Sequence, residues 1–217
     1  MNLLSILVKG GWVMLPIFLS SIIAVAIIIE RYIILKKASI NVPSFLIKIR
    51  NLLKRGDIKG AIEYCMEEKS PMSNIVKKGL KKYKFGHQRV MEAIESAGKQ
   101  EISRLERGLP VLATISGVAP LLGFLGTVTG MISAFMKIQD LQGSASPSDL
   151  AGGIWEALLT TAFGLIVGII ALTFYNYFVS RVNKLVIEME LISNDVVDVL
   201  EESSKKEITD DNLEIEL

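Results

Sequence analysis

One apolar stretch, residues 154–179, constrains the fold of this chain more than any other feature. About 20 apolar residues in a helix suffice to cross a hydrocarbon core ~30 Å thick, so this stretch predicts a transmembrane helix. It contains a single charged side chain, Glu156. A carboxylate inside a membrane is costly unless it faces protein or water, and intramembrane acids usually have a function. Glu156 is therefore the first candidate for an ion-handling residue.

On a helical wheel, small and polar residues gather on one face with Glu156 at its edge, within an arc of roughly 140°. This face consists of Gly153, Ala157, Thr160, Thr161, Gly164, Gly168 and Ala171, with Val167 as a bulky exception. Small side chains let helix backbones approach closely, so packing alone is an alternative interpretation. Packing accounts for the glycines but not for Glu156, and ion handling is the favoured interpretation.

A second apolar stretch, residues 109–136, is uncharged and carries a narrow stripe of small or hydroxyl side chains, within about 80° on the wheel. The stripe consists of Ser116, Pro120, Gly123, Thr127, Gly130 and Ala134. Taken alone it favours packing. If several copies of the chain formed a ring, with this stripe and the Glu156 face both turned inward, the two faces would surround a narrow polar lumen. Further candidates to line that lumen are Thr160, Ser116 and Gly123.

The first apolar stretch, residues 12–35, is interrupted only by the neighbouring Glu30 and Arg31. It is too long for the apolar core of a signal peptide and predicts a retained spanning helix after a short N-terminus, so residues 1–35 form the first segment. Half of the residues are hydrophobic, while the formal net charge is only +1. The chain is expected to be an all-α, polytopic membrane protein with three transmembrane helices, the third over 154–180.

Loop charges predict the orientation. Residues 36–108 contain 17 Lys or Arg against 8 Asp or Glu, whereas the loop 137–153 has one Lys and two Asp. Positively charged segments stay in the cytoplasm, so 36–108 is expected inside, the loop and the N-terminus in the periplasm, and the C-terminus inside. The basic excess also favours contact with anionic membrane lipids. No recognition motif for nucleic acid accompanies it.

The basic segment 36–108 is expected to be a small helical domain, with helix starts at Asp57 and at Ser70-Pro71. From Gln88 onward the apolar period continues without a break into the second span. One helix over 88–136, about 70 Å long, is therefore expected to extend far into the cytoplasm.

The third span is expected to continue as a cytoplasmic helix over 181–202, because its apolar stripe persists. The tail 203–217 is polar and acidic and is expected to be disordered. In the loop before this span, Ser146-Pro147-Ser148-Asp149 predicts a helix start at Pro147.

Enzyme chemistry finds little support in the sequence. Cys65 is the single cysteine and His87 the single histidine, so neither has the companions of a metal site or a catalytic triad. No phosphate-binding glycine loop is present. We expect a non-enzymatic protein without cofactor or metal, whose ligand is a translocated H⁺, with Na⁺ as the alternative ion.

Two membrane motifs resemble a known family. They are Ala119-Pro-Leu-Leu-Gly-Phe-Leu-Gly-Thr-Val-Thr-Gly-Met-Ile and Gly153-Ile-Trp-Glu-Ala-Leu-Leu-Thr-Thr-Ala-Phe-Gly-Leu. Together they are similar to the MotA/TolQ/ExbB proton channel family, most of all to its ExbB branch. By this resemblance Glu156 matches the intramembrane glutamate, and Thr127 and Thr161 match the pore threonines. Thr160 and Thr129 stand where many members have Ala and Trp.

The resemblance implies a homopentamer in the inner membrane of a Gram-negative-type bacterium. Its lumen would hold a one-span ExbD-like or TolR-like partner that carries an intramembrane Asp. Proton flow would then drive outer-membrane transport through a TonB-like protein. The alternatives are a TolQ-like subunit, a sodium-driven stator and a purely structural membrane scaffold.

Overall fold

The computed structural model describes the backbone of residues 10–215 and the side chains of residues 10–202. Within that part every regular element is a helix, so the all-α prediction is confirmed. The chain divides into two compact units. The first comprises residues 1–32 and 108–179, and the second comprises 33–107 and 180–217. The predicted N-terminal segment before residue 10 lies outside the described residues.

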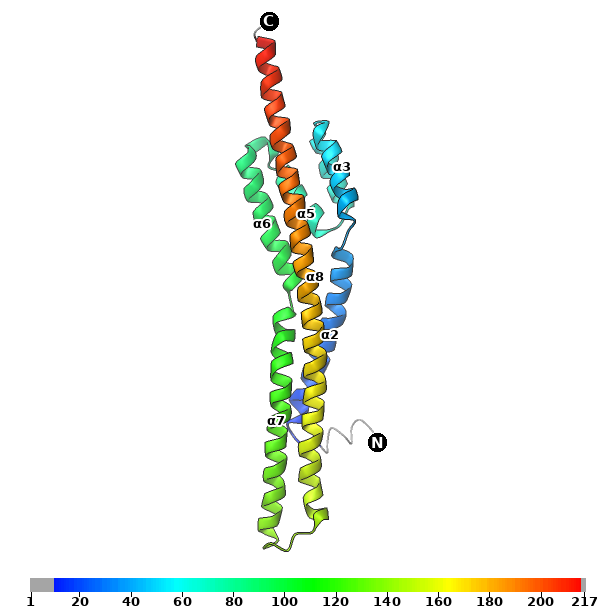
Figure 1. Cartoon of the computed structure of the whole chain (residues 1–217), viewed down its shortest axis with the longest axis vertical. Helices are drawn as coiled ribbons and strands as arrows, with labels where there is room; N and C mark the ends of the chain where they lie inside the picture. The colour runs from blue at the N-terminus through cyan, green and yellow to red at the C-terminus, as the bar shows by residue number, and fades with distance from the viewer. Residues whose placement is uncertain (1–9, 216–217) are drawn as a thin grey trace. The chain divides into compact units, whose positions relative to one another are not determined.

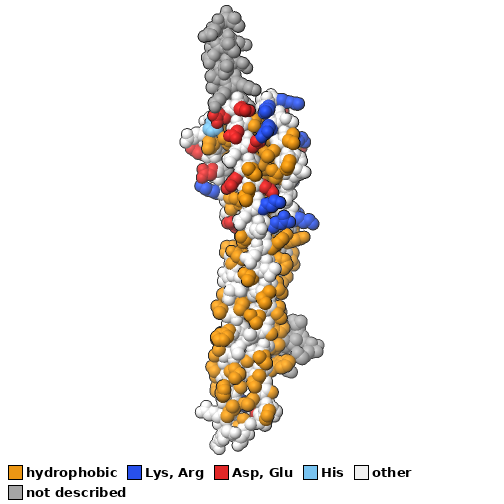
Figure 2. All heavy atoms as spheres, viewed as in Figure 1, with side chains coloured by type: hydrophobic (Ala, Val, Ile, Leu, Met, Phe, Trp, Pro, Cys, Tyr) orange, Lys and Arg blue, Asp and Glu red, His pale blue; other side chains and the backbone are white. Residues whose placement is uncertain are grey.

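Three helices contribute to the first unit, and the described chain holds three helical stretches long and apolar enough to cross a membrane. α2 covers Met14–Ala38, α7 covers Leu109–Asp140 and α8 covers Pro147–Ile215. α7 and α8 run side by side and are joined by a short loop (Figure 1). Hydrophobic side chains dominate the visible surface of this unit, whereas charged side chains gather on the second unit (Figure 2).

α2 has one buried face in the first unit, carrying Ile17, Ala24 and Arg31 at intervals of seven residues. The Arg31 guanidinium is buried and donates to the Glu30 carboxylate, with 2.6 Å between Nη2 and Oε1. Glu30 itself is largely exposed. This pairing keeps a buried cation from being isolated.

The second unit contains four short helices besides the far part of α8. They are α3 (Val42–Lys54), α4 (Ile58–Glu67), α5 (Pro71–Leu80) and α6 (His87–Glu106), with a 3-10 turn η1 (Tyr83–Phe85) before α6. Asp57 caps α4 by accepting from the Gly60 amide at 2.8 Å. Ser70 and Ser73 form a reciprocal capping box at α5. Both predicted helix starts are confirmed.

The core of the second unit is formed by apolar side chains from α3, α4, α5, α6 and α8. Cys65 is buried in it, and α8 contributes a buried face over residues 182–200 that confirms its predicted extension. The large buried side chains include Phe45, Ile49, Leu53, Met72, Ile75, Leu80, Val90, Ile94, Met189 and Ile192. Arg50 of α3 forms an ion pair with Asp195 of α8.

Three expectations are corrected. The single helix over 88–136 is wrong, because the chain breaks between α6 and α7. Arg107 is extended and Gly108 is left-handed with φ +84°, and the helix restarts with the amide of Leu112 donating to the Gly108 carbonyl. Pro110 lacks an amide hydrogen and is tolerated only in the first turn of a helix, so the new helix begins at Leu109.

The loop between the second and third spans is also shorter than the predicted 137–153. α7 continues to Asp140, and α8 starts at Pro147, where Asp149 accepts a hydrogen bond from the Ser146 amide at 2.9 Å. The tail 203–217, expected to be disordered, is helical to Ile215. Residues 203–215 include no Pro or Gly that would end a helix. Their side chains, and residues 216–217, lie outside the described part.

Candidate functional site

Small residues bring the backbones of α7 and α8 into close contact in the first unit. A methyl group placed on Gly164 would lie 2.6 Å from the carbonyl oxygen of Ala119, and one on Gly130 would lie 2.6 Å from that of Gly153. No side chain larger than hydrogen fits at these points. The two small-residue stripes predicted from the sequence therefore do face each other.

Thr127 and Thr161 meet across this contact. Their hydroxyl groups are hydrogen-bonded to each other, and the Thr161 oxygen also lies 3.0 Å from the Gly123 carbonyl oxygen. Both side chains are only half-buried. Because each hydroxyl both donates and accepts, the pair can relay a hydrogen bond or orient a water molecule, but it cannot hold a charge near neutral pH. The structure thus brings the two predicted pore threonines together.

The three further lining candidates have different surroundings. Thr160 is fully buried and packs against Gly126, and its hydroxyl donates within α8 to the Glu156 or Ala157 carbonyl at 2.9 and 3.1 Å. The Ser116 hydroxyl donates to the Ala113 carbonyl of its own helix at 2.7 Å. Within this chain both act in packing and local bonding, and their role in a pore stays a prediction.

Gly123, the third of these candidates, is buried within the contact between α7 and α8. A methyl group there would lie 3.0 Å from the Thr160 carbonyl oxygen and 3.1 Å from the Thr161 Cα. Gly123 therefore sets the spacing at which the two threonine hydroxyls meet.

Glu156 is half-buried and lies on α8 one turn before Thr160. Its carboxyl group contacts the backbone at Gly11, which precedes α2 with φ +67°. A methyl group on Gly11 would lie 2.6 Å from the Glu156 carboxyl carbon. The backbone directly before the first apolar stretch therefore lies next to the carboxylate. A left-handed backbone and a close approach both require glycine at this position.

Sequence reasoning missed Gly11 and Gly126. Gly11 belongs to a Gly-Gly pair directly before the apolar stretch, which is a signal for unusual backbone geometry. Its contact with Glu156 could not be foreseen, because 144 residues separate the two in the sequence. Gly126 lies just outside the 80° stripe drawn on α7, yet its surface accommodates the Thr160 side chain.

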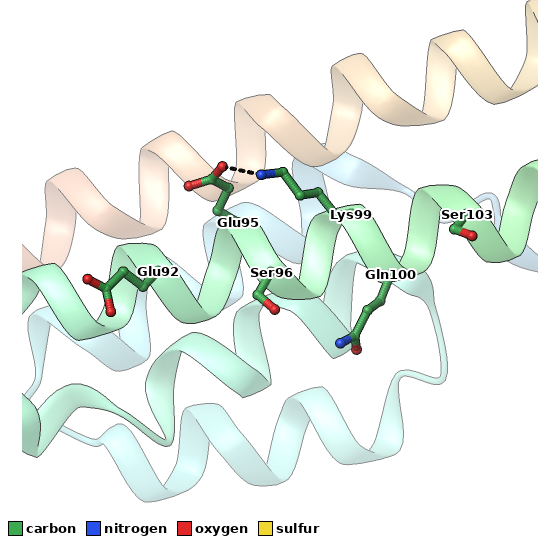
Figure 3. A pocket seen from close by; sticks show the side chains of 6 residues that line it. All are labelled: Glu92, Glu95, Ser96, Lys99, Gln100 and Ser103. Carbon is green, nitrogen blue, oxygen red and sulfur yellow. Dashed lines mark hydrogen bonds and ion pairs between the residues drawn. The ribbon is translucent and has the colours of Figure 1, made fainter.

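Other reactive side chains form no second site in the described residues. Burial raises the pKa of the Cys65 thiol to about 12, so it stays protonated and unreactive. No group of three His, Cys, Asp or Glu side chains in the described part could hold a metal. A groove along α6 is lined from that one helix alone (Figure 3). Its Glu95–Lys99 pair, 2.6 Å apart, spans one helical turn and is ordinary surface pairing.

Comparison with known proteins identifies the family. Residues 67–191, which contain Thr127, Glu156 and Thr161, match the model of the MotA/TolQ/ExbB proton channel family. A putative biopolymer transport protein ExbB homolog of Methanothermobacter thermautotrophicus is 33% identical over 165 residues, which cover 76% of this chain and 58% of that protein.

Two further proteins agree with this match. A putative ExbB-like protein of Synechocystis is 32% identical over 186 residues, which cover 82% of this chain and 71% of that protein. The solved structure of C. jejuni MotAB has the same fold, with a TM-score of 0.66 at 18% identity over 93% of this chain and 81% of that chain. The chain is thus a member of the MotA/TolQ/ExbB proton channel family.

Proposed function

We propose that this chain is the ion-conducting subunit of an ion-driven membrane motor, with H⁺ as the translocated ion. One observation carries the proposal. Glu156 is the only charged side chain in the apolar stretches 109–136 and 154–180, and it lies on the same helix as Thr161, whose hydroxyl meets that of Thr127. In a channel family, a carboxyl group on the helix that carries one of two paired hydroxyls supplies a group that binds a proton and groups that orient water.

The proposed cycle uses Glu156 as the proton acceptor and donor. A carboxyl group can take up and release a proton, and an acid inside a membrane that faces protein or water usually has a function of this kind. Thr127 and Thr161 would orient water further along α8. Each proton that crosses ~100 mV releases about 2.3 kcal/mol, which is the energy available for work.

A second chain is part of the proposal. Proton paths in pumps usually use several titratable groups, and this chain offers one carboxylate in its second and third spans. We propose a homopentamer around a one-span ExbD-like or TolR-like partner whose Asp completes the path. The names of the relatives, ExbB and TolQ, and the MotAB structure support an assembly of this kind.

The energised process is proposed to be TonB-dependent outer-membrane transport, because three of the most similar relatives carry ExbB-type names. A TolQ-like role is the second candidate, supported by 42% identity to TolQ of Haemophilus influenzae over 93 residues. A sodium-driven stator and a purely structural scaffold are the remaining alternatives. Replacing Glu156 would leave a scaffold unaffected.

The proposed location is the inner membrane, with the N-terminus outside and the C-terminus inside. The substitutions Lys81→Cys and Ser144→Cys, each made in a Cys65→Ala background, test this orientation. Both positions are exposed in the chain. An impermeant maleimide added to intact spheroplasts should label position 144 and spare position 81 until the cells are lysed. Labelling at 81 before lysis would contradict the orientation.

Proton flux into proteoliposomes tests the need for a partner. The purified protein is reconstituted alone and together with a one-span protein of the same organism that carries an intramembrane Asp. Flux is followed by a pH-sensitive dye after a potassium diffusion potential is imposed. We expect flux only with the partner. Equal flux in both preparations would show that this chain conducts by itself.

A further inference from the structure

A small cavity of about 240 Å³ lies in the second unit between the end of α2, the start of α5 and the end of α6. Three basic side chains line it, Lys37, Lys69 and Arg104. Ligand pockets for whole small molecules usually have about 300–1,000 Å³, so this cavity suits a single chemical group such as a headgroup. The ion path described above includes none of its residues.

The cavity has an excess of positive charge. Its single carboxylate, Glu101, is largely buried and already bonded: it accepts from Asn74 Nδ2 at 3.2 Å and lies 4.0 Å from the guanidinium of Arg104. Lys37 and Lys69 are exposed, and neither is paired with a carboxylate among the described residues. Two ammonium groups therefore face the cavity without a counter-charge.

The backbone adds to this positive field. α5 begins at Pro71, which lines the cavity beside its cap Ser70. The N-terminus of a helix carries a partial positive charge, which favours an anion in front of it. The capping box already uses the Ser73 amide, so the lysines, and not this helix end, supply the main attraction.

The cavity also has an apolar wall and lies where a spanning helix ends. Ile34, Ala38 and Leu105 line it, and the exposed Ile33 stands next to it on α2. Lys37 belongs to the last turn of α2, two residues after the apolar stretch ends. Lysines at such helix ends extend toward lipid headgroups, while apolar neighbours contact the glycerol and first acyl carbons.

We propose that this cavity binds the phosphate group of an anionic phospholipid from the leaflet at which α2 ends. Lys37 and Lys69 hold the phosphate, and the α2 side of the cavity holds the start of an acyl chain. The lipid would thereby connect the end of the first span to α5 and α6. A soluble phosphate ester shares the charge but lacks the apolar part.

Native mass spectrometry of the full-length protein in detergent tests this site. Dioleoyl phosphatidylglycerol is titrated against the native chain, a Lys37→Gln/Lys69→Gln variant and a Lys54→Gln/Lys59→Gln control with the same change in net charge. Lys54 and Lys59 are exposed in the same unit and lie outside the cavity. Since each basic residue contributes ~1 kcal/mol near an anionic lipid, the first variant should bind roughly thirtyfold more weakly. The control should bind like the native chain.

Two further probes separate the sources of the phosphate. Dioleoyl phosphatidylcholine should show no saturable binding, and glycerol 3-phosphate should leave the protein free at concentrations at which phosphatidylglycerol saturates it. Equal affinity for glycerol 3-phosphate would overturn the assignment to a lipid. Equal weakening in the Lys54/Lys59 control would overturn the site itself, because it would show that overall charge alone sets the affinity.

Discussion

Replacement of glycine by alanine along the α7–α8 contact should destabilise the protein according to how closely the opposite backbone approaches. At Gly164 an added methyl group would lie 2.6 Å from the Ala119 carbonyl oxygen and 2.9 Å from the Gly123 Cα. Ordinary contact begins at about 3.4 Å, so the helices would have to separate by roughly 0.8 Å. The atoms that the methyl group meets belong to the backbone, so no side-chain rotation can relieve the clash.

The energetic cost follows from that separation. Overpacking of a tight contact costs ~1–3 kcal/mol. The same shift stretches the 3.0 Å distance between the Thr161 hydroxyl and the Gly123 carbonyl to about 3.8 Å, beyond hydrogen-bonding range, and loses ~1 kcal/mol. The higher helix propensity of alanine offsets ~1 kcal/mol of this destabilisation. We expect Gly164→Ala to lower the free energy of unfolding by about 1–3 kcal/mol.

Gly117→Ala is the matched control, because Gly117 lies on α7, the helix that Gly164 of α8 packs against, and has no atom within 4 Å of an added methyl group. It should be neutral or stabilising by up to ~1 kcal/mol. Unfolding of both variants in mixed micelles with increasing dodecyl sulfate, followed by tryptophan fluorescence, measures the difference. If Gly164→Ala were as stable as Gly117→Ala, the close helix contact would be refuted.

Three further predictions concern the site and the second unit. Thr161→Val keeps the shape of the side chain but removes the hydroxyl shared with Thr127, and should lower proton flux several-fold while the oligomer mass measured by light scattering stays unchanged. Gly11→Ala should lower flux more strongly, because the methyl group displaces the Glu156 carboxyl and strains a left-handed backbone; flux equal to that of the native chain would contradict the contact. Burial raises the pKa of Cys65 to about 12, so its contribution to stability should be complete below about pH 9 and lost as the pH rises toward 12. Chemical denaturation of the native chain and Cys65→Ala at pH 7 and pH 10.5 measures this loss, and an equal pH dependence in both would argue against it.

Local signals in the sequence predicted much of the fold. Asp57 and Ser70 are strong N-cap residues followed by apolar helical periods, and both start helices as expected. The stripe on α7 and the face on α8 were predicted from the 100° rotation per residue, which is a local property. Their mutual contact through Thr127 and Thr161 needed only the short connection that forces consecutive helices to pack as neighbours.

The break at Gly108 was missed because apolar periodicity passes through it: Ile102, Leu105 and Leu109 keep the helical spacing on both sides. The combination of Gly108 and Pro110 was the contrary signal, and backbone conformation outweighed the side-chain pattern. The Gly11–Glu156 contact depends on how α2 packs within the first unit. Such a contact between distant segments leaves no periodic trace in the sequence.

Proton flux in a Glu156→Gln variant tests the central claim most directly. Glutamine keeps the size and hydrogen-bonding capacity of the side chain but cannot release a proton, and Glu156→Asp serves as a control that keeps the acid. Native chain and variants are reconstituted with the one-span partner, and assembly is verified by mass. We expect the proton flux of the Glu156→Gln complex to be at least about tenfold lower than that of the native complex, because the positioned acid is the proton carrier. The Glu156→Asp complex should retain part of the native flux. Full flux from an assembled Glu156→Gln complex would contradict the claim.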